Sequence, residues 1–360
     1  MEALEEEKQL PEILKRLQIA DAGDLTFDTA AIEAEYQNQK GESTSLVIKV
    51  VSVLGGFMAS SSFIGFLALG GLFDSGIALL VFGIGFIAAA LWINQLKNLL
   101  VDTAIISGFV IGFVLTGIGI NILHGGDNTI CITLISLAIC ALCITRNYLL
   151  CFISLLIING SLLVLIGIHN SYNLVHLYIT GNAIAYTLMI LYEARLITAY
   201  PSLSKLYNPI RIGLVFSLVA GLVIAGIKDV FPVSYYSNGI SSVVLMILVV
   251  WMESKVTALV KVSGSTYKII IYAATILVML PTLFSPAVSG SLLIILLSFY
   301  VNHKTGFGLG IMSLMYALWQ YYYDLHFSLL TKSLILMGSG ILFLIVYFIC
   351  NRYLQSNEDL

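Results

Sequence analysis

The stretch that decides the fold is SGIALLVFGIGFIAAALW, residues 75–92, which holds no charged residue over 18 positions. A helix of this length rises about 27 Å, close to the roughly 30 Å hydrocarbon core of a bilayer. The alternation with period two that a membrane β-strand requires is missing. This stretch predicts a membrane-spanning helix, and similar stretches recur along the chain.

The composition extends this prediction to the whole protein. Of the 360 residues, 59% are apolar and 10% are charged, and the mean hydropathy is +0.98. An average soluble domain has roughly 25% charged residues, so this chain lacks the polar side chains needed to cover a soluble core. The composition excludes a soluble enzyme, a nucleic-acid-binding protein and a disordered chain. It predicts an all-α, polytopic transmembrane helix bundle in a lipid bilayer.

Between Ser45 and Cys350 the apolar stretches predict about 12 spans, with ten to twelve as the range. The predicted spans are 45–72, 75–92, 98–122, 128–145, 147–168, 173–195, 210–228, 238–260, 267–282, 285–301, 305–322 and 328–350. With the N-terminus inside and the spans alternating, 14 of the 17 basic residues fall on the cytoplasmic side and only Lys228 falls in an outer loop. Because positive charge marks cytoplasmic loops, both termini are predicted to be cytoplasmic.

The acidic residues define a separate N-terminal segment. Residues 1–44 hold eleven acidic and four basic residues, a net charge of −7. Apolar residues of this segment, such as Leu10, Ile13, Leu14 and Leu17, follow helical spacing. The predicted organisation is therefore an acidic cytoplasmic tail of two short helices (1–44), a transmembrane bundle (45–350) and a short cytoplasmic C-terminal tail (351–360).

Several stretches resemble an uncharacterised family of bacterial polytopic membrane proteins that is known only as a domain of unknown function. The main stretch is YYYDLHFSLLTKSLILMGSGILFL (321–344), supported by PAVSGSLLI (286–294), GGF (55–57) and GFLALG (65–70). Members of this family are often encoded beside a small membrane protein named for a GDYXXLXY motif. The resemblance implies a bacterial inner-membrane protein and a small single-span membrane partner, and it implies no mechanism.

The outer end of the last predicted hairpin carries the first candidate site. Tyr322, Tyr323, Asp324 and His326 lie near the predicted turn, and Lys332 lies about one turn inside the last span. Tyrosine is common at the membrane interface, and Lys332 could snorkel outward or pair with Asp324. A charge inside a span is nevertheless a functional hypothesis by default. The cluster is predicted to be either a structural pair or an outer-face site for a partner or ligand.

Asn159 and Asn182 form the second candidate, a polar pair near the centres of adjacent spans. Antiparallel neighbours joined by a short turn place the two amides at similar depth. A hydrogen bond between them would hold the helices together, while the alternative role is to line a solute or ion path.

The remaining polar residues predict no catalytic residue, no metal site and no cofactor site. Glu193, Arg195 and Glu253 read as anchors at the ends of spans, and His303 stands alone on the inner side.

Three functions remain open. The preferred one is a non-enzymatic membrane component that acts with a small membrane partner. The alternative is a secondary transporter of a small solute, for which twelve spans are typical although no charge lies at the midplane. The third is a membrane-embedded enzyme on lipid-linked substrates.

Overall fold

The computed structural model describes Gly55, Met58 and residues 61–93, 99–199, 201–227, 235–259 and 265–324. Nine single positions follow, namely Leu330, Ser333, Leu334, Met337, Gly338, Gly340, Ile341, Leu344 and Phe348. The chain divides into two compact units, Met1–Ser61 and Ser62–Leu360. Of the first unit only Gly55, Met58 and Ser61 are described, and they are helical. The predicted helices of the acidic tail lie outside the described residues.

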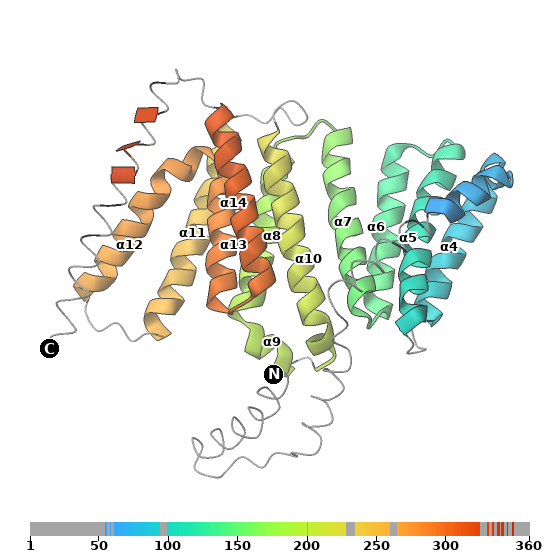
Figure 1. The fold of residues 1–360 in the computed structure, drawn as a ribbon, viewed down its shortest axis with the longest axis horizontal. Helices are drawn as coiled ribbons and strands as arrows, with labels where there is room; N and C mark the ends of the chain where they lie inside the picture. The colour runs from blue at the N-terminus through green and yellow to red at the C-terminus, as the bar shows by residue number, and fades with distance from the viewer. Residues whose placement is uncertain are drawn as a thin grey trace, which may run out of the picture. The chain divides into compact units, whose positions relative to one another are not determined.

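The second unit is all-α, and the described residues contain no strand (Figure 1). Its helices are α4 (Gly76–Ile93), α5 (Leu99–Ile122), α6 (Asp127–Ile144), α7 (Tyr148–Ile168), α8 (Leu174–Leu191), α9 (Glu193–Ala199), α10 (Pro201–Gly226), α11 (Tyr235–Leu259), α12 (Ser265–Met279), α13 (Pro286–Tyr300) and α14 (Lys304–Asp324). Two short 3₁₀ helices, η1 (Leu72–Asp74) and η2 (Leu280–Phe284), precede α4 and α13.

Each predicted span between residues 75 and 322 corresponds to one of these α-helices or to a helix with its short extension. In the described part of the chain, seven helical segments are long and apolar enough to cross a membrane. They are Gly76–Ile93, Ile105–Ile122, Asp127–Ile144, Tyr148–Ile168, Leu174–Leu191, Leu206–Gly226 and Gly239–Ala258, with Pro286–Tyr300 as a shorter apolar helix. The chain is therefore a membrane protein in its architecture.

Two predicted boundaries were wrong, and both surround the site described below. The predicted span 173–195 is broken at Tyr192, and the short helix α9 begins at the next residue, Glu193. The predicted span 210–228 is the C-terminal part of α10, which already begins at Pro201. Proline suits a first helical position because its fixed φ is helical and its missing N–H would be unpaired there. Arg211 consequently lies ten residues inside a helix rather than at its start.

The hairpin turns share one local device. His124, Asn170 and Asn302 each adopt a left-handed backbone conformation, with φ of 59°, 50° and 52°. In each case the next residue donates its N–H to the carbonyl five positions back, which is the pattern that ends a helix in a tight reversal. These turns explain why consecutive helices return beside each other with few connecting residues.

Glycines set the closest approach in the bundle, between α4 and α5. A Cβ on Gly83 would lie 2.9 Å from the Gly112 carbonyl oxygen, and a Cβ on Gly119 would lie 3.0 Å from that of Gly76. Small residues allow such backbone contact between membrane helices. Gly112 takes part in this close approach, whereas Gly108 meets only the Phe86 ring at 3.7 Å.

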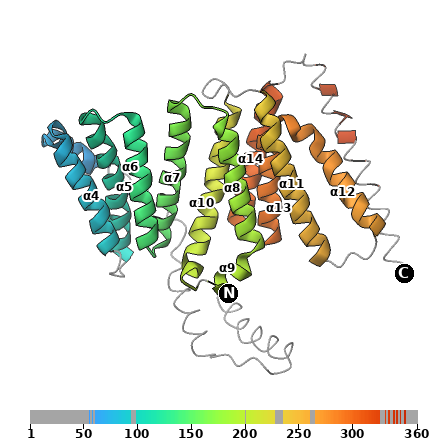
Figure 2. The same cartoon turned by 180° about the vertical axis from the view of Figure 1, so that it is seen from behind.

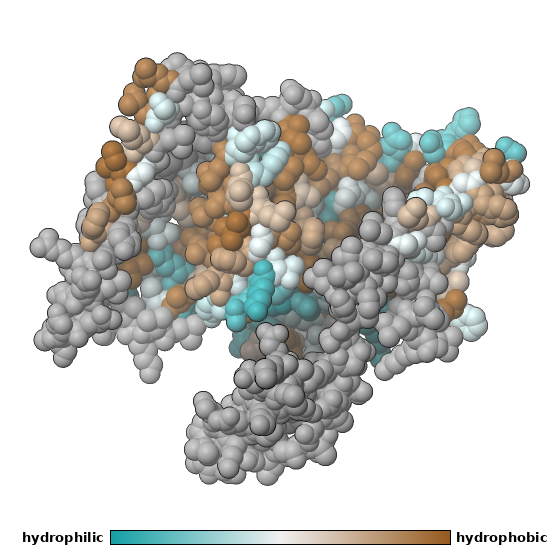
Figure 3. Space-filling view, viewed as in Figure 1, coloured by the Kyte–Doolittle hydropathy of each residue, from teal (hydrophilic) through white to brown (hydrophobic). Residues whose placement is uncertain are grey.

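The largest core lies among α8, α10, α11, α13 and α14, with Tyr186, Leu218, Leu245 and Leu293 fully buried. Helix α10 contacts both α7 and α8, while α7 and α8 touch little. Figure 2 shows α8 and α10 side by side from behind. The outward surface of the helices is largely hydrophobic, with hydrophilic surface gathered near helix ends (Figure 3). Such exposed apolar surface is expected where helices face lipid.

Candidate functional site

The predicted outer-face cluster cannot be placed as a site. Tyr322, Tyr323 and Asp324 belong to the last turn of α14, but their side chains are not among the described parts. His326 and Lys332 lie outside the described residues. This cluster stays a prediction.

The two asparagines lie on α7 and α8, but they do not bond to each other. The Asn159 amide donates to the Leu155 carbonyl at 3.0 Å, and the Asn182 amide donates to the Tyr178 carbonyl at 3.0 Å. Each bond stays within its own helix, and α10 packs against both α7 and α8, which touch each other little. Among the hydrogen bonds of the described residues, none joins the two amides.

Buried polar atoms without a hydrogen-bond partner have an uneven distribution. Within the described residues there are six such side-chain atoms, and all lie in α10, α8, α11 or α14. They are His176 Nε2, Arg211 Nε, Ser217 Oγ, Ser242 Oγ, Glu253 Oε2 and Gln320 Oε1. A buried unsatisfied polar atom costs free energy unless water or a ligand meets it. The same four helices therefore carry every described buried atom at which a bound water or ligand is expected.

Polar contacts between helices are found in the same part of the molecule. Near the start of α8, the buried His176 Nδ1 lies 2.8 Å from the Ser241 hydroxyl of α11. Deeper in the bundle the Tyr178 hydroxyl donates to the Ser217 carbonyl of α10 at 3.1 Å. Between α13 and α14 the hydroxyls of Ser291 and Ser313 lie 2.7 Å apart. Side-chain hydrogen bonds of this kind link membrane helices where their interfaces are polar.

The most concentrated polar group lies at the end of the bundle where α9 begins, here called the α9 end. Tyr186 of α8 is fully buried, and its hydroxyl lies 3.0 Å from the Ser298 hydroxyl of α13. Tyr207 of α10 donates to the Met189 carbonyl at 3.1 Å. The Arg211 guanidinium lies over the Tyr207 ring, 5.4 Å from its centroid, and donates to Asn208 Oδ1 at 2.7 Å.

His303 is the other member of this group, in the turn between α13 and α14. Its Nδ1 accepts the Gly306 N–H at 3.0 Å, so the imidazole caps the first turn of α14. Burial, together with the positive charge of Arg211, lowers the pKa of His303 below its ordinary value. Because Nδ1 accepts a hydrogen bond, the neutral ring carries its proton on Nε2. The histidine that was predicted to stand alone has Arg211 as its charged neighbour.

One feature of the sequence, the position of Arg211 within a span, points to this group. With α10 extended to Pro201, Arg211 is a cation within a candidate span, and such residues mark functional sites by default. The partly buried Glu253, which was predicted to be an anchor, likewise lies within a span and accepts from the Thr275 hydroxyl of α12 at 2.7 Å. The pairing of Arg211 with His303, 92 positions later, had no local signature.

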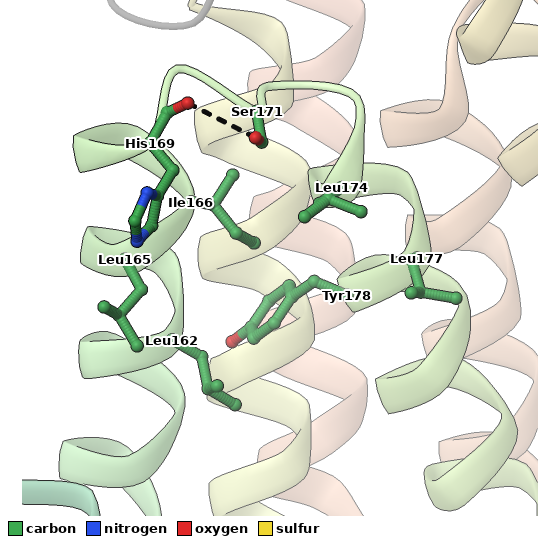
Figure 4. Close-up of a pocket in the computed structure, with 8 residues that line it drawn as sticks. All are labelled: Leu162, Leu165, Ile166, His169, Ser171, Leu174, Leu177 and Tyr178. Carbon is green, nitrogen blue, oxygen red and sulfur yellow. Dashed lines mark hydrogen bonds between the residues drawn. The ribbon is translucent and has the colours of Figure 1, made fainter. Parts of the chain in front are cut away.

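A cavity of about 400 Å³ lies between α7 and α8 at the end of the helices opposite α9. Figure 4 shows His169 and Ser171 near the turn between α7 and α8, and the Tyr178 ring below them between the two helices. The other lining residues are Leu162, Leu165, Ile166, Leu174 and Leu177. The wall is apolar, as in a groove that faces lipid or another helix.

Comparison with known proteins gives one family. The model of a domain of unknown function, DUF4401, matches residues 45–353. No curated protein and no solved structure matches the chain.

Proposed function

Because the chain belongs to the DUF4401 family, whose description names no activity, we propose its function from its own geometry: a membrane carrier for a small polar solute. The solute moves along the polar interior of α8, α10, α11, α13 and α14. The chain crosses a bacterial inner membrane about twelve times with both termini in the cytoplasm, so that the α9 end is the cytoplasmic end of this interior. A carrier function is thus favoured over the function of a membrane component that acts with a small partner.

The observation that carries this proposal is the confinement of the described unpartnered buried polar atoms to α8, α10, α11 and α14. These atoms occur at both ends of the helices. His176 is the third residue of α8, and Arg211 is the sixth residue of the candidate span Leu206–Gly226, counted from the opposite end of the bundle. The 15 residues from His176 to the end of α8 at Leu191 correspond to about 22 Å along the helix, most of the thickness of a hydrocarbon core. Water or solute at these atoms would form a polar path of the length that a carrier needs.

Water access tests the path directly. In a variant whose five cysteines are replaced, a single cysteine is placed at Ser217 or Ser242 on the path. The control position is Ser154 of α7, which is equally buried but donates to the Leu150 carbonyl at 2.8 Å. A small water-soluble thiol reagent reacts only with the thiolate, which forms in water and not in an apolar core. We expect labelling at positions 217 and 242 and none at 154; equal protection at all three would contradict the path.

Transport itself is measured in proteoliposomes that contain the full-length protein. A panel of labelled acetate, phosphate, choline, glycine and glucose is tested for exchange between the inside and outside of the vesicle. We expect exchange of at least one member above that of protein-free vesicles. A leucine at Ser217 would fill the path and abolish the exchange, while a leucine at the lipid-facing Ser136 of α6 would not. Exchange that is unaffected by the Ser217 change would refute this route.

The groove between α7 and α8 favours a second candidate, a membrane component with a small single-span partner. Leu174 and Leu177 on its rim are 48% and 69% exposed, which leaves an apolar strip for a helix to cover. Replacing Leu177 by tryptophan would then release the partner from the purified complex, whereas the same change at Leu188, 41% exposed on the same helix, would not. Retention of the partner in both variants would exclude the groove as its site.

A further inference from the structure

The charge of Arg211 is only partly met by its surroundings. The residue lies in a candidate span and is partly buried, and its Nε is buried without a partner. Its described contacts are one hydrogen bond to Asn208 and the side chain of Tyr207, whose hydroxyl also interacts with the Glu193 carboxylate. A guanidinium has five N–H donors in a planar fork. In the part of the chain that the structure describes, no salt bridge joins Arg211 to a carboxylate.

Hydroxyl donors lie beside this cation. The Tyr186 and Ser298 hydroxyls share one hydrogen bond, which uses only one of their two hydrogens, so the other can be donated to a third acceptor. Arg211 lies within electrostatic range of both the Tyr186 hydroxyl and the His303 ring. Arg211 on α10, Tyr186 on α8 and Ser298 on α13 thus bring a guanidinium and two hydroxyls to the α9 end, and a small acceptor with negative charge is the group they suit.

We propose that Arg211, Tyr186, Ser298 and His303 form a binding site for a small anion, a carboxylate or an oxyanion, at the α9 end. The proposal rests on the carrier function and names the substrate class of that carrier. The planar fork of arginine matches the two oxygens of a carboxylate or phosphate, which a lysine would not. The anion must be small, because Tyr186 and Ser298 are buried.

Anion binding at this site takes up a proton. The positive charge of Arg211 is one of the two causes that lower the pKa of His303. A bound anion offsets that charge and raises the pKa again, so the bound state holds more protons than the free state; the added proton enters at Nδ1, which then no longer accepts the Gly306 N–H. By linkage, the affinity rises as the pH falls below the ordinary histidine value of about 6.5. The carrier would accordingly move the anion together with a proton.

Other titratable groups at the α9 end surround the same site. In the described chain they are Tyr148 on α7, Glu193 and Arg195 on α9, Tyr207 on α10, Tyr300 on α13 and Lys304 on α14. Glu193 is tested separately by substitution with glutamine.

The test is binding of sodium acetate and sodium phosphate to the full-length protein in nanodiscs, by calorimetry at pH 5.5, 6.5 and 7.5. Arg211→Gln is compared with Arg195→Gln, which removes an exposed arginine of α9 at the same end. His303→Asn keeps an acceptor for the Gly306 N–H but does not titrate. We expect Arg211→Gln to weaken binding of at least one probe tenfold or more, and Arg195→Gln to leave it within twofold. Arg211→Lys keeps the charge and should give an intermediate loss.

The pH dependence of the anion affinity distinguishes two cases: a site in which anion binding is coupled to protonation of His303, and a site in which Arg211 acts only through its charge. In the parent protein we expect the affinity to rise several-fold from pH 7.5 to 5.5, and His303→Asn should remove most of this rise while Glu193→Gln retains it. Equal affinity in the parent and Arg211→Gln would overturn the site, and a full pH slope in His303→Asn would overturn the coupling. Anion binding without exchange in vesicles would refute the carrier function and support the anion site. Exchange of glucose alone, at the same rate in Arg211→Gln, would support a carrier and refute the anion site.

Discussion

Replacing Gly306 by alanine tests the packing that holds the candidate site together. The new Cβ would lie 2.5 Å from Ser298 Oγ and 2.8 Å from His303 Nδ1, both closer than real contacts allow. Each neighbour would have to move, and each makes one hydrogen bond that depends on its position. His303 caps α14 through the Gly306 N–H, and Ser298 bonds the Tyr186 hydroxyl of α8.

The size of the effect follows from these two bonds. Losing a helix N-cap costs about 1 kcal/mol, and losing a hydrogen bond between membrane helices costs about 0.6 kcal/mol. Alanine in place of glycine returns about 1 kcal/mol of helix propensity. Gly306→Ala should therefore lower the free energy of unfolding by about 0.6 kcal/mol. Gly308→Ala meets nothing within 4 Å and should raise it by about 1 kcal/mol.

The assay is reversible unfolding of both variants in mixed detergent micelles, followed by circular dichroism. The expected difference between the two alanine variants is about 1.6 kcal/mol, with opposite signs relative to the parent. Anion binding in Gly306→Ala should be weakened as well, because the same change displaces Ser298 and His303. If both variants were stabilised equally, the contact between α14, Ser298 and His303 would not exist as described.

Three further predictions address pH, the asparagines and the glycine contact. The pKa of His303 is lower in the folded protein than in the unfolded chain. Below about pH 6.5 the unfolded chain therefore binds more protons, and the free energy of unfolding falls as the pH falls from that value toward the folded pKa. Unfolding curves of His303→Asn should lack the share of this pH-dependent decrease that comes from the histidine. Because Asn159 and Asn182 each bond a carbonyl of their own helix, a double-mutant cycle to leucine should give a coupling energy below about 0.5 kcal/mol, and a value near 2 kcal/mol would restore the predicted pair. Gly112→Val should destabilise by about 1–3 kcal/mol because its Cβ would lie 2.7 Å from the Gly83 carbonyl oxygen, whereas Gly108→Val should cost clearly less in the same micelle assay.

Hydropathy located the helices well because each span depends on its own residues. A lipid environment requires every backbone group to be bonded within the segment, so a stretch of about 20 apolar residues has little choice but a helix. Helices α4 to α7 begin and end within one residue of the predicted bounds. Hydropathy does not identify helices that continue through polar sequence. The polar segment from Pro201 to Asn208 predicts a loop, although it forms the first turns of α10.

The candidate site was less predictable for the same reason. Arg211 and His303 can be identified in the sequence as polar residues, but the sequence around each of them does not predict that they lie near each other. Their proximity arises because the α13–α14 hairpin packs against α10. The asparagine pair shows the converse error. Adjacency in the chain suggested adjacency in space, and α10 instead contacts both helices that carry the asparagines.

The sequence by itself determined the all-α membrane architecture, the positions of the spans and the resemblance to its family. These depend on local composition, since transfer into lipid and backbone bonding act on one segment at a time. Only the tertiary structure decided which helices touch, which polar atoms stay without partners and which cation faces His303. Those features depend on packing between segments far apart in the chain, where small residues and hydroxyls choose among many helix pairs of nearly equal hydrophobicity.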